Sequence, residues 1–370
     1  MNNRFDKRAL VIVGVWLVIV NVFAVFALNR LELRPDTAYR WIEPSGFAQA
    51  HSLDLIGLHA RWDGEWYLDI AREGYRYAGS GQLSNIVFFP LYPTLVAVLT
   101  PILFGHVALA GWLIASLFLA LAALALTRLV RRHHPHIDPE QVLLFLLVFP
   151  TAFFLNAVYT ESLFLFLSIL TFYFLFEKRW WAAGIVGGLA ALTRVTGVLL
   201  FIPAVFELLR AVGPQQALRK LPPLLLIPAG LAAFFSFHGL AFGNALLFFD
   251  VQKSWGRSFR FNPEHFDVWT APATVNLAMD VTFLVIAVIA AVLAWRKLRP
   301  SYGAYMLAAI AAAVSTGSLA SIGRYTLVLF PLFLLLAGLK SQSVRTAWLF
   351  GSTLLLAVNI ALFVSNGWAG

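Results

Sequence analysis

Carboxylates and aromatic side chains are interleaved in one polar segment of the chain. Asp63 and Glu65 stand there among Trp62, Trp66 and Tyr67. A carboxylate can accept a hydrogen bond from a sugar hydroxyl or act as a general base, and aromatic rings pack against the C–H faces of sugars. Because the two carboxylates are two positions apart, they would point to different sides of a helix and need not act as a pair. The segment predicts a carbohydrate site, with an interfacial aromatic belt as the structural alternative.

Three further ionisable residues lie in or beside apolar stretches. Glu161 stands between two apolar runs and Arg194 lies within one. Ionised groups at membrane depth cost free energy and usually serve a site. A guanidinium donates two hydrogen bonds to phosphate oxygens, so Arg194 suits a lipid-linked phosphate, and Arg324 is a second candidate. The structural alternatives are a Glu161–Arg194 pair that holds two helices together and a snorkelling arginine at position 324.

Other chemistries find little support in the sequence. Cysteine is absent, which excludes disulfides, thiolate metal sites and cysteine nucleophiles. His133, His134 and His136 surround a proline and are interpreted as part of a solvated cytoplasmic loop, not as a metal site. Without a strand pattern there is no place for a Gly-rich phosphate loop that would bind a nucleotide sugar. We expect no metal and no cofactor, and a transferase of this kind would take its sugar from a lipid carrier.

Apolar segments dominate the rest of the chain. Hydrophobic residues make up 60% of the 370 residues, charged residues only 12%, and the mean hydropathy is +0.80. A soluble domain carries about 25% charged residues, so lipid must solvate most of this chain. The sequence predicts a single all-α domain over residues 1–370, a polytopic transmembrane helical bundle of about 11 to 12 membrane segments. The apolar runs are Ala9–Asn29, Val87–Phe104, Val107–Leu126, Val142–Ala157, Ser162–Phe176, Ala182–Leu209, Leu221–Phe242, Thr274–Ala294, Tyr302–Leu319, Tyr325–Leu339 and Ala347–Val364.

The net charge of +9 comes from small basic groups between these runs. That distribution is typical of orientation signals and not of a nucleic-acid-binding face. The positive-inside rule would place all the groups in the cytoplasm, which needs an odd number of crossings between Asn29 and Arg128. Val107–Leu126 supplies one, so Val87–Phe104, which contains three prolines, is predicted to be re-entrant or surface-lying. The groups are Arg4/Lys7/Arg8, Arg128/Arg131/Arg132, Lys178/Arg179, Arg210/Arg219/Lys220, Arg296/Lys297/Arg299 and Lys340/Arg345.

This orientation leaves two long outer loops, Arg30–Ile86 and Gly243–Pro272, the second of which carries Arg257 and Arg260. The long run Ala182–Leu209 is interrupted by Thr193–Gly197, so we expect two short helices to meet at a turn inside the membrane. The first apolar run follows a basic N-terminus and has no small-residue cleavage site at its end. It is therefore predicted to be a retained transmembrane helix.

Four motifs follow one another along the chain: Arg61–Tyr75, Phe88–Pro93, Tyr159–Phe164 and Leu192–Gly197. In this order they resemble the motifs of the PIG-V family of GPI mannosyltransferases, and especially of its bacterial relatives. The first motif contains a Trp-Asp pair followed by Ile-Ala and Gly-Tyr. The resemblance runs along most of the first two hundred residues, and two later segments, Gln252–Arg257 and Gly323–Tyr325, are similar to bacterial members.

The resemblance implies a membrane glycosyltransferase of the GT-C group, in which a catalytic acidic residue lies in the first outer loop. The matching position is Asp63, in a catalytic loop over about residues 30–86. The implied reaction is an inverting transfer of a sugar, mannose in the family, from a polyprenyl- or dolichyl-phosphate donor to a lipid or glycan acceptor. It would take place on the extracytoplasmic face of a multi-pass protein, expected in a bacterial plasma membrane. Trp66 stands where eukaryotic members tend to have His, and a GPI precursor is not a natural bacterial substrate, so the acceptor does not carry over.

Three functions follow as alternatives. In the enzyme hypothesis Asp63 is the general base, and the other predicted site residues hold the phosphate or orient the sugar and acceptor. A polytopic transporter or lipid-carrier flippase would instead line a path with buried ionisable groups, but transporters often show two related halves, and this chain has a single polar break. A non-catalytic scaffold of an envelope-assembly complex would tolerate changes at Asp63. The residues expected to bind substrate are Arg61, Glu65, Tyr159, Glu161, Arg194, Arg257 and Arg324.

Overall fold

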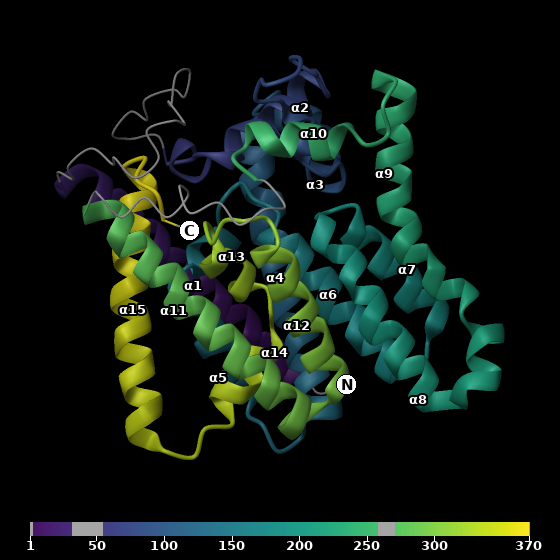
Figure 1. Ribbon diagram of the computed structural model, residues 1–370. Helices are drawn as coiled ribbons and strands as arrows, with labels where there is room; N and C mark the ends of the chain where they lie inside the picture. Colours follow the sequence, from purple (N-terminus) through teal and green to yellow (C-terminus); the bar gives the residue numbers. More distant parts are fainter. Residues whose placement is uncertain (1–2, 32–54, 258–270, 370) are drawn as a thin grey trace.

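The structure, a computed structural model, describes residues 3–31, 55–257 and 271–369, which form helices and no strand (Figure 1). Parts of both predicted outer loops, residues 32–54 and 258–270 with Arg260, lie outside the described residues. Among the described residues, six helical segments are long and apolar enough to cross a membrane. This confirms the predicted all-α polytopic bundle. The six segments are Arg4–Arg30, Val107–His133, Val195–Lys220, Pro222–Phe242, Thr274–Leu298 and Gln342–Val364.

Shorter helices fill the space between these spans and cover one end of the bundle. Four of them are apolar: Leu91–Leu103, Glu161–Phe176, Trp180–Ala191 and Pro300–Val314. The helices are α1 (Asn3–Arg30), α2 (Asp63–Glu73), α3 (Leu91–Leu99), α4 (Val107–His133), α5 (Pro139–Leu147), α6 (Glu161–Phe176), α7 (Trp180–Ala191), α8 (Phe201–Lys220), α9 (Leu226–Phe242), α10 (Leu247–Ser254), α11 (Ala271–Leu293), α12 (Pro300–Val314), α13 (Ile322–Leu327), α14 (Pro331–Ala337) and α15 (Gln342–Val364). Tighter turns include η1 (Gly57–His59), η2 (Asn85–Val87), η3 (Thr100–Leu103) and η5 (Val195–Leu200).

Ion pairs join several basic groups at one end of the bundle. Arg8 of α1 pairs with Glu140 at the start of α5, with 2.8 Å between the charged atoms. Arg132 at the end of α4 pairs with Glu177, which follows α6, at 3.1 Å. Exposed pairs of this kind add little stability, but they show which helix ends lie together. The N-terminus lies at this end, whereas α2 and α10 cover the opposite end (Figure 1).

The proline-containing segment at residues 87–104 forms only a short helix. It begins with η2, continues as α3 and ends in η3, and α4 starts directly afterwards at Val107. At about 1.5 Å per residue its continuous helical part, Leu91–Leu103, is about 20 Å long, shorter than a hydrocarbon core of about 30 Å. Pro90 and Pro93 lie at the N-terminal end of α3, where a missing N–H costs least. The re-entrant or surface-lying placement of this segment stays a prediction.

The predicted break in the long apolar run is present. α7 ends at Ala191, a turn follows, and the chain resumes as η5 and α8. The helix that follows the turn is itself short, because α8 (Phe201–Lys220) is divided by a kink at Gly213, whose φ is 74°. The turn is tight: a Cβ on Gly197 would lie 2.3 Å from the carbonyl of Ala190. Glycine at this position therefore allows η5 to fold back on α7 and fixes where Arg194 points.

Small residues also let α7 approach its neighbour closely. A Cβ on Gly184 would lie 1.9 Å from the carbonyl oxygen of Pro223, and one on Gly188 would lie 2.6 Å from that of Leu226. Gly184 and Gly188 are four residues apart and form one face of the helix. Close backbone contact through such small-residue pairs is a common way for membrane helices to associate. This contact holds α7, and so the turn that carries Arg194, against the start of α9.

Candidate active site

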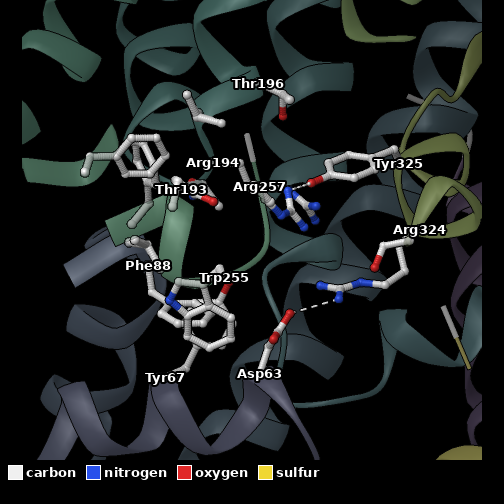
Figure 2. Close-up of a pocket in the computed structure, with 16 residues that line it drawn as sticks. Asp63, Tyr67, Phe88, Thr193, Arg194, Thr196, Trp255, Arg257, Arg324 and Tyr325 are labelled. Atoms are coloured by element: carbon white, nitrogen blue, oxygen red, sulfur yellow. Dashed lines mark hydrogen bonds and ion pairs between the residues drawn. The ribbon is translucent and has the colours of Figure 1, made fainter. Parts of the chain in front are cut away.

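A pocket of about 730 Å³, including its open mouth, lies at the end of the bundle covered by α2 and α10. Its walls come from α2, the segment before α3, the turn between α7 and η5, the end of α10 and the start of α13. Figure 2 shows these side chains pointing toward a common space. The lining residues are Asp63, Tyr67, Val87, Phe88, Phe89, Thr193, Arg194, Val195, Thr196, Phe248, Gln252, Trp255, Arg257, Ser321, Arg324 and Tyr325.

Asp63 is the first residue of α2, and its side chain is 28% exposed toward the pocket. Its backbone N–H donates to the hydroxyl of Tyr159 at 3.1 Å, and that hydroxyl donates to the carbonyl of Arg61 at 2.9 Å. Gly64 permits the close approach, because a Cβ there would lie 3.3 Å from the carbonyl oxygen of Val158. The start of α2 is therefore fixed against the segment that precedes α6.

Arg324 connects two carboxylates from different helices. Its Nη1 donates to Asp63 Oδ2 at 2.9 Å, and its Nε donates to Glu161 Oε1 at 3.0 Å. The guanidinium also lies 4.7 Å from the ring centroids of Phe154 and Tyr159, so cation–π attraction adds to the ion pairs. Arg324 thus joins α2, α6 and α13 at one point, although it is distant from both carboxylates in the sequence.

Glu161 is the centre of this cluster and has no exposed surface. Its Oε1 accepts from Arg324 and also from Nη1 of Arg194, at 2.7 Å. A buried carboxylate is costly unless it is paired and hydrogen-bonded, and two guanidinium groups meet that need here. The Glu161–Arg194 pair considered from the sequence is present. It also includes Arg324, so the carboxylate orients both arginines at the pocket wall.

Arg257 adds a third guanidinium to the pocket. Its Nη1 donates to the hydroxyl of Tyr325 at 2.8 Å (Figure 2), and it forms no ion pair within the described part of the chain. Together with Arg194 and Arg324 it gives three positive charges against the two carboxylates Asp63 and Glu161. The cluster has a surplus of one positive charge, 3 − 2 = +1. An anionic group in the pocket would balance it.

Aromatic rings form the opposite wall of the pocket. The rings of Tyr67 and Phe88 meet edge to face at 5.0 Å between centroids, and those of Phe88 and Trp255 at 5.6 Å. Trp66 supports the wall from behind with contacts to Phe88 and Trp255. Trp255 follows α10, so the segment predicted to be the second outer loop also contributes to the site. The faces of such rings suit the C–H surface of a sugar.

The structure places the eight predicted site residues in three ways. Asp63, Arg194, Arg257 and Arg324 line the pocket. Tyr159 and Glu161 are buried behind the lining and hold its residues in place. Arg61 and Glu65 do not line it, and their role as substrate contacts stays a prediction. Partial burial raises the pKa of the Glu65 carboxyl above its ordinary value, with Arg72 and Arg61 opposing this effect.

Several lining residues were not among the predicted site residues. Tyr325 and Trp255 belong to segments that the sequence had marked as similar to bacterial members, and neighbouring arginines were the only residues chosen from them. Phe88 belongs to the second family motif but had been assigned no role. The available signal for Tyr325 and Trp255 was that each is an aromatic residue close in sequence to an arginine predicted to bind substrate. Thr193 and Thr196 flank Arg194 on the turn and also line the pocket.

The histidine cluster lies at the other end of the bundle and differs from its prediction. His134 is buried, not solvated, and its Nε2 lies 3.1 Å from the hydroxyl of Tyr302. Burial lowers the pKa of His134 to about 4, so its ring is neutral at neutral pH. Within the described residues no group of three or more His, Asp or Glu side chains is arranged to hold a metal ion.

A comparison with protein families gives one match that covers more than half of the chain. Residues 10–225 match the model of the family described as mannosyltransferase (PIG-V). The chain belongs to this family. The match includes Asp63, Glu161 and Arg194, but it ends before Arg257 and Arg324. This confirms the predicted family and its class, the membrane glycosyltransferases.

Individual relatives match a smaller part of the chain. GPI alpha-1,6-mannosyltransferase 2 of Mus musculus is 35% identical over 169 residues, which are 43% of this chain and 33% of that protein. The Homo sapiens protein of the same name is 34% identical over the same length. The match thus spans about a third of the length of these relatives. The superposition on the structure of ArnT from Cupriavidus metallidurans bound to undecaprenyl phosphate covers 95% of this chain and 76% of the ArnT chain. The sequence identity is 14% and the TM-score is 0.49.

Proposed function

We propose that this protein transfers a sugar, mannose by its family, from a polyprenyl-phosphate donor to an acceptor hydroxyl, with inversion at the anomeric carbon. The observation that supports this best is the combination of one accessible carboxylate, three guanidinium groups and an aromatic wall in a single pocket. A sugar would pack on the aromatic wall and its phosphate would lie among the arginines. The acceptor hydroxyl would approach Asp63.

The proposed reaction is a single displacement. Asp63 accepts the proton of the acceptor hydroxyl, whose oxygen attacks the anomeric carbon while the bond from that carbon to the phosphate oxygen breaks. The lipid phosphate leaves with the electron pair, so no general acid is needed. A double displacement would require a second carboxylate as nucleophile. Glu161 is unsuited to that role, because it has no exposed surface and is held by two arginines. One accessible carboxylate favours inversion.

The arginines would stabilise the charge that develops on the leaving phosphate. Guanidinium groups donate paired hydrogen bonds to phosphate oxygens, and fixed donors of this kind are often the largest contribution to catalysis. Arg257 is the best placed to bind the phosphate first, because no carboxylate in the described residues neutralises it. Arg194 and Arg324 keep fixed positions through Glu161 and need not reorganise during the reaction.

We expect Arg257→Ala to raise the KM for a polyprenyl-phosphate sugar by about tenfold to a hundredfold, because a charged hydrogen bond contributes roughly 1.5–3 kcal/mol. Arg257→Lys should recover part of the loss, since lysine keeps the charge without the planar fork. Radiolabelled sugar transfer by the purified enzyme measures the effect. Lys253→Ala is the matched control, because Lys253 is exposed, lies in the same segment and does not line the pocket. Equal KM values for the two alanine variants would contradict the proposal. In a separate assay, uptake of a polyprenyl-phosphate sugar into vesicles without sugar transfer would favour a transporter.

The site is proposed to face the extracytoplasmic side, because the basic groups that mark the cytoplasmic side lie at the other end of the bundle. The chain has no cysteine, so single cysteines can report on topology. We expect a membrane-impermeant maleimide added to intact cells to label Glu73→Cys on α2 and not Lys297→Cys, both of which are exposed positions. Both should be labelled after permeabilisation. The opposite pattern would place the pocket on the cytoplasmic face.

A further inference from the structure

The turn immediately before Asp63 has an unusual backbone conformation. Trp62 has φ 53° and ψ −120°, and the N–H of Gly64 donates to the carbonyl of Arg61 at 3.0 Å. These are the features of a type II′ turn with Trp62 at its first central position, where glycine is strongly preferred. A bulky residue with positive φ persists only where its surroundings hold it. The strained residue therefore needs a tether, and it directly precedes the proposed base.

The tether comes from the segment that follows α15, about three hundred residues further along the chain. Trp62 Nε1 donates to the carbonyl of Gly367 at 3.2 Å. The rings of Trp62 and Trp368 meet edge to face, with 5.4 Å between centroids and an angle of 88° between planes. The segment itself is fixed to α15, since the N–H of Gly367 donates to the carbonyl of Leu362 at 2.7 Å. Trp62 is thus held by both a hydrogen bond and an aromatic contact.

Trp368 also lies close to residues that hold α13, the helix that carries Arg324. It lines a small pocket with Thr151, Asp280 and Asn359. The hydroxyl of Thr151 donates to the carbonyl of Gly323 at 3.0 Å, one residue before Arg324. One side of Trp368 therefore contacts the turn before Asp63, and the other borders the residues that hold α13. Trp368 therefore lies beside the supports of both Asp63 and Arg324, which form one ion pair.

We propose that Trp368 is a positioning residue for the proposed transferase. By holding Trp62 in its strained turn, it sets where the Asp63 carboxylate enters the pocket. Trp368 does not line the pocket. Its loss would let the turn relax toward an ordinary backbone conformation and move the carboxylate away from Arg324. A displacement of about 1 Å can lower a rate by up to about a hundredfold.

The test combines kinetics with hydrogen exchange on the full chain in detergent. Trp368→Ala should lower kcat by about tenfold to a hundredfold per folded molecule, with the KM for the donor within twofold, because the phosphate-binding arginines remain. Trp368→Phe should recover most of the activity, since it keeps an aromatic ring against Trp62. Trp348→Ala is the control, a tryptophan near the start of α15. Should the alanine variant fail to fold, Trp368→Leu keeps the bulk and takes its place.

A double-mutant cycle separates positioning from a general loss of stability. In a Trp62→Gly background the turn needs no tether, so Trp368→Ala should have no further effect on kcat. Amide exchange in residues 63–67 should rise in Trp368→Ala and not in Trp348→Ala. An unchanged kcat, or a loss of the same size in both backgrounds, would overturn the proposal. The exchange measurement needs no substrate, so it tests the coupling even if the protein proves not to transfer a polyprenyl-linked sugar.

Discussion

Asp63→Asn is expected to lower kcat for sugar transfer by a factor of about 10² to 10⁴, the usual contribution of a positioned general base. Asn keeps the size of the side chain and can still accept a hydrogen bond from Arg324, but it cannot take a proton from the acceptor. Asp63 is the only carboxylate among the described residues that lines the pocket, so no neighbour can replace it. Binding of a polyprenyl phosphate should survive, because the three arginines remain.

The matched control for this prediction is Glu73→Gln. Glu73 lies on the same helix, is exposed, and the change removes one negative charge in the same way. We expect its transfer rate to stay within twofold of the unmodified protein. A single-turnover assay with a radiolabelled lipid-phosphate sugar measures the chemical step directly and avoids a slow product release. If Asp63→Asn and Glu73→Gln transfer at the same rate, Asp63 has no part in the chemistry.

The parts of the site that the sequence could predict are those with a local signal. Asp63 stands out because a carboxylate among aromatic residues interrupts a mostly apolar chain, and Arg194 because it interrupts an apolar run. The break at Thr193–Gly197 was visible for the same reason. The bundle itself followed from hydropathy and from basic groups between the runs. These inferences need only neighbouring residues, and the structure places Asp63 and Arg194 at one pocket.

The parts that the sequence could not predict depend on contacts between distant segments. Arg324 meets Asp63 only because α13 folds back on the start of α2. Tyr159 was expected to orient a substrate, yet its hydroxyl is used by the backbone of the turn before α2. The contact of Trp62 with Trp368 has no local signal at all, since both are ordinary interfacial residues by composition. Partner choice for buried polar groups is decided by packing, which one sequence does not reveal.

The largest effect on stability is expected from Glu161→Gln. Glu161 has no exposed surface and offers one oxygen to both Arg194 and Arg324. The change keeps the volume of the side chain but leaves two buried guanidinium groups facing each other without their shared anion. Removal of one member of a buried ion pair costs about 3–5 kcal/mol, because the remaining charge is left uncompensated. Both arginines should also lose their fixed positions, so transfer should fall together with stability.

Glu140→Gln provides the comparison that separates burial from pairing. Glu140 pairs with Arg8 at 2.8 Å, nearly as short a contact as the 2.7 Å between Glu161 and Arg194, but the side chains of Arg8 and Glu140 are 47% and 34% exposed. An exposed pair contributes at most about 1 kcal/mol, so Glu140→Gln should shift the unfolding midpoint in detergent only slightly. Nearly equal midpoints for the two glutamine variants would mean that water or a bound anion compensates the arginines around Glu161. The charge balance would then be set by the ligand, and the midpoint of Glu161→Gln should rise steeply with added polyprenyl phosphate.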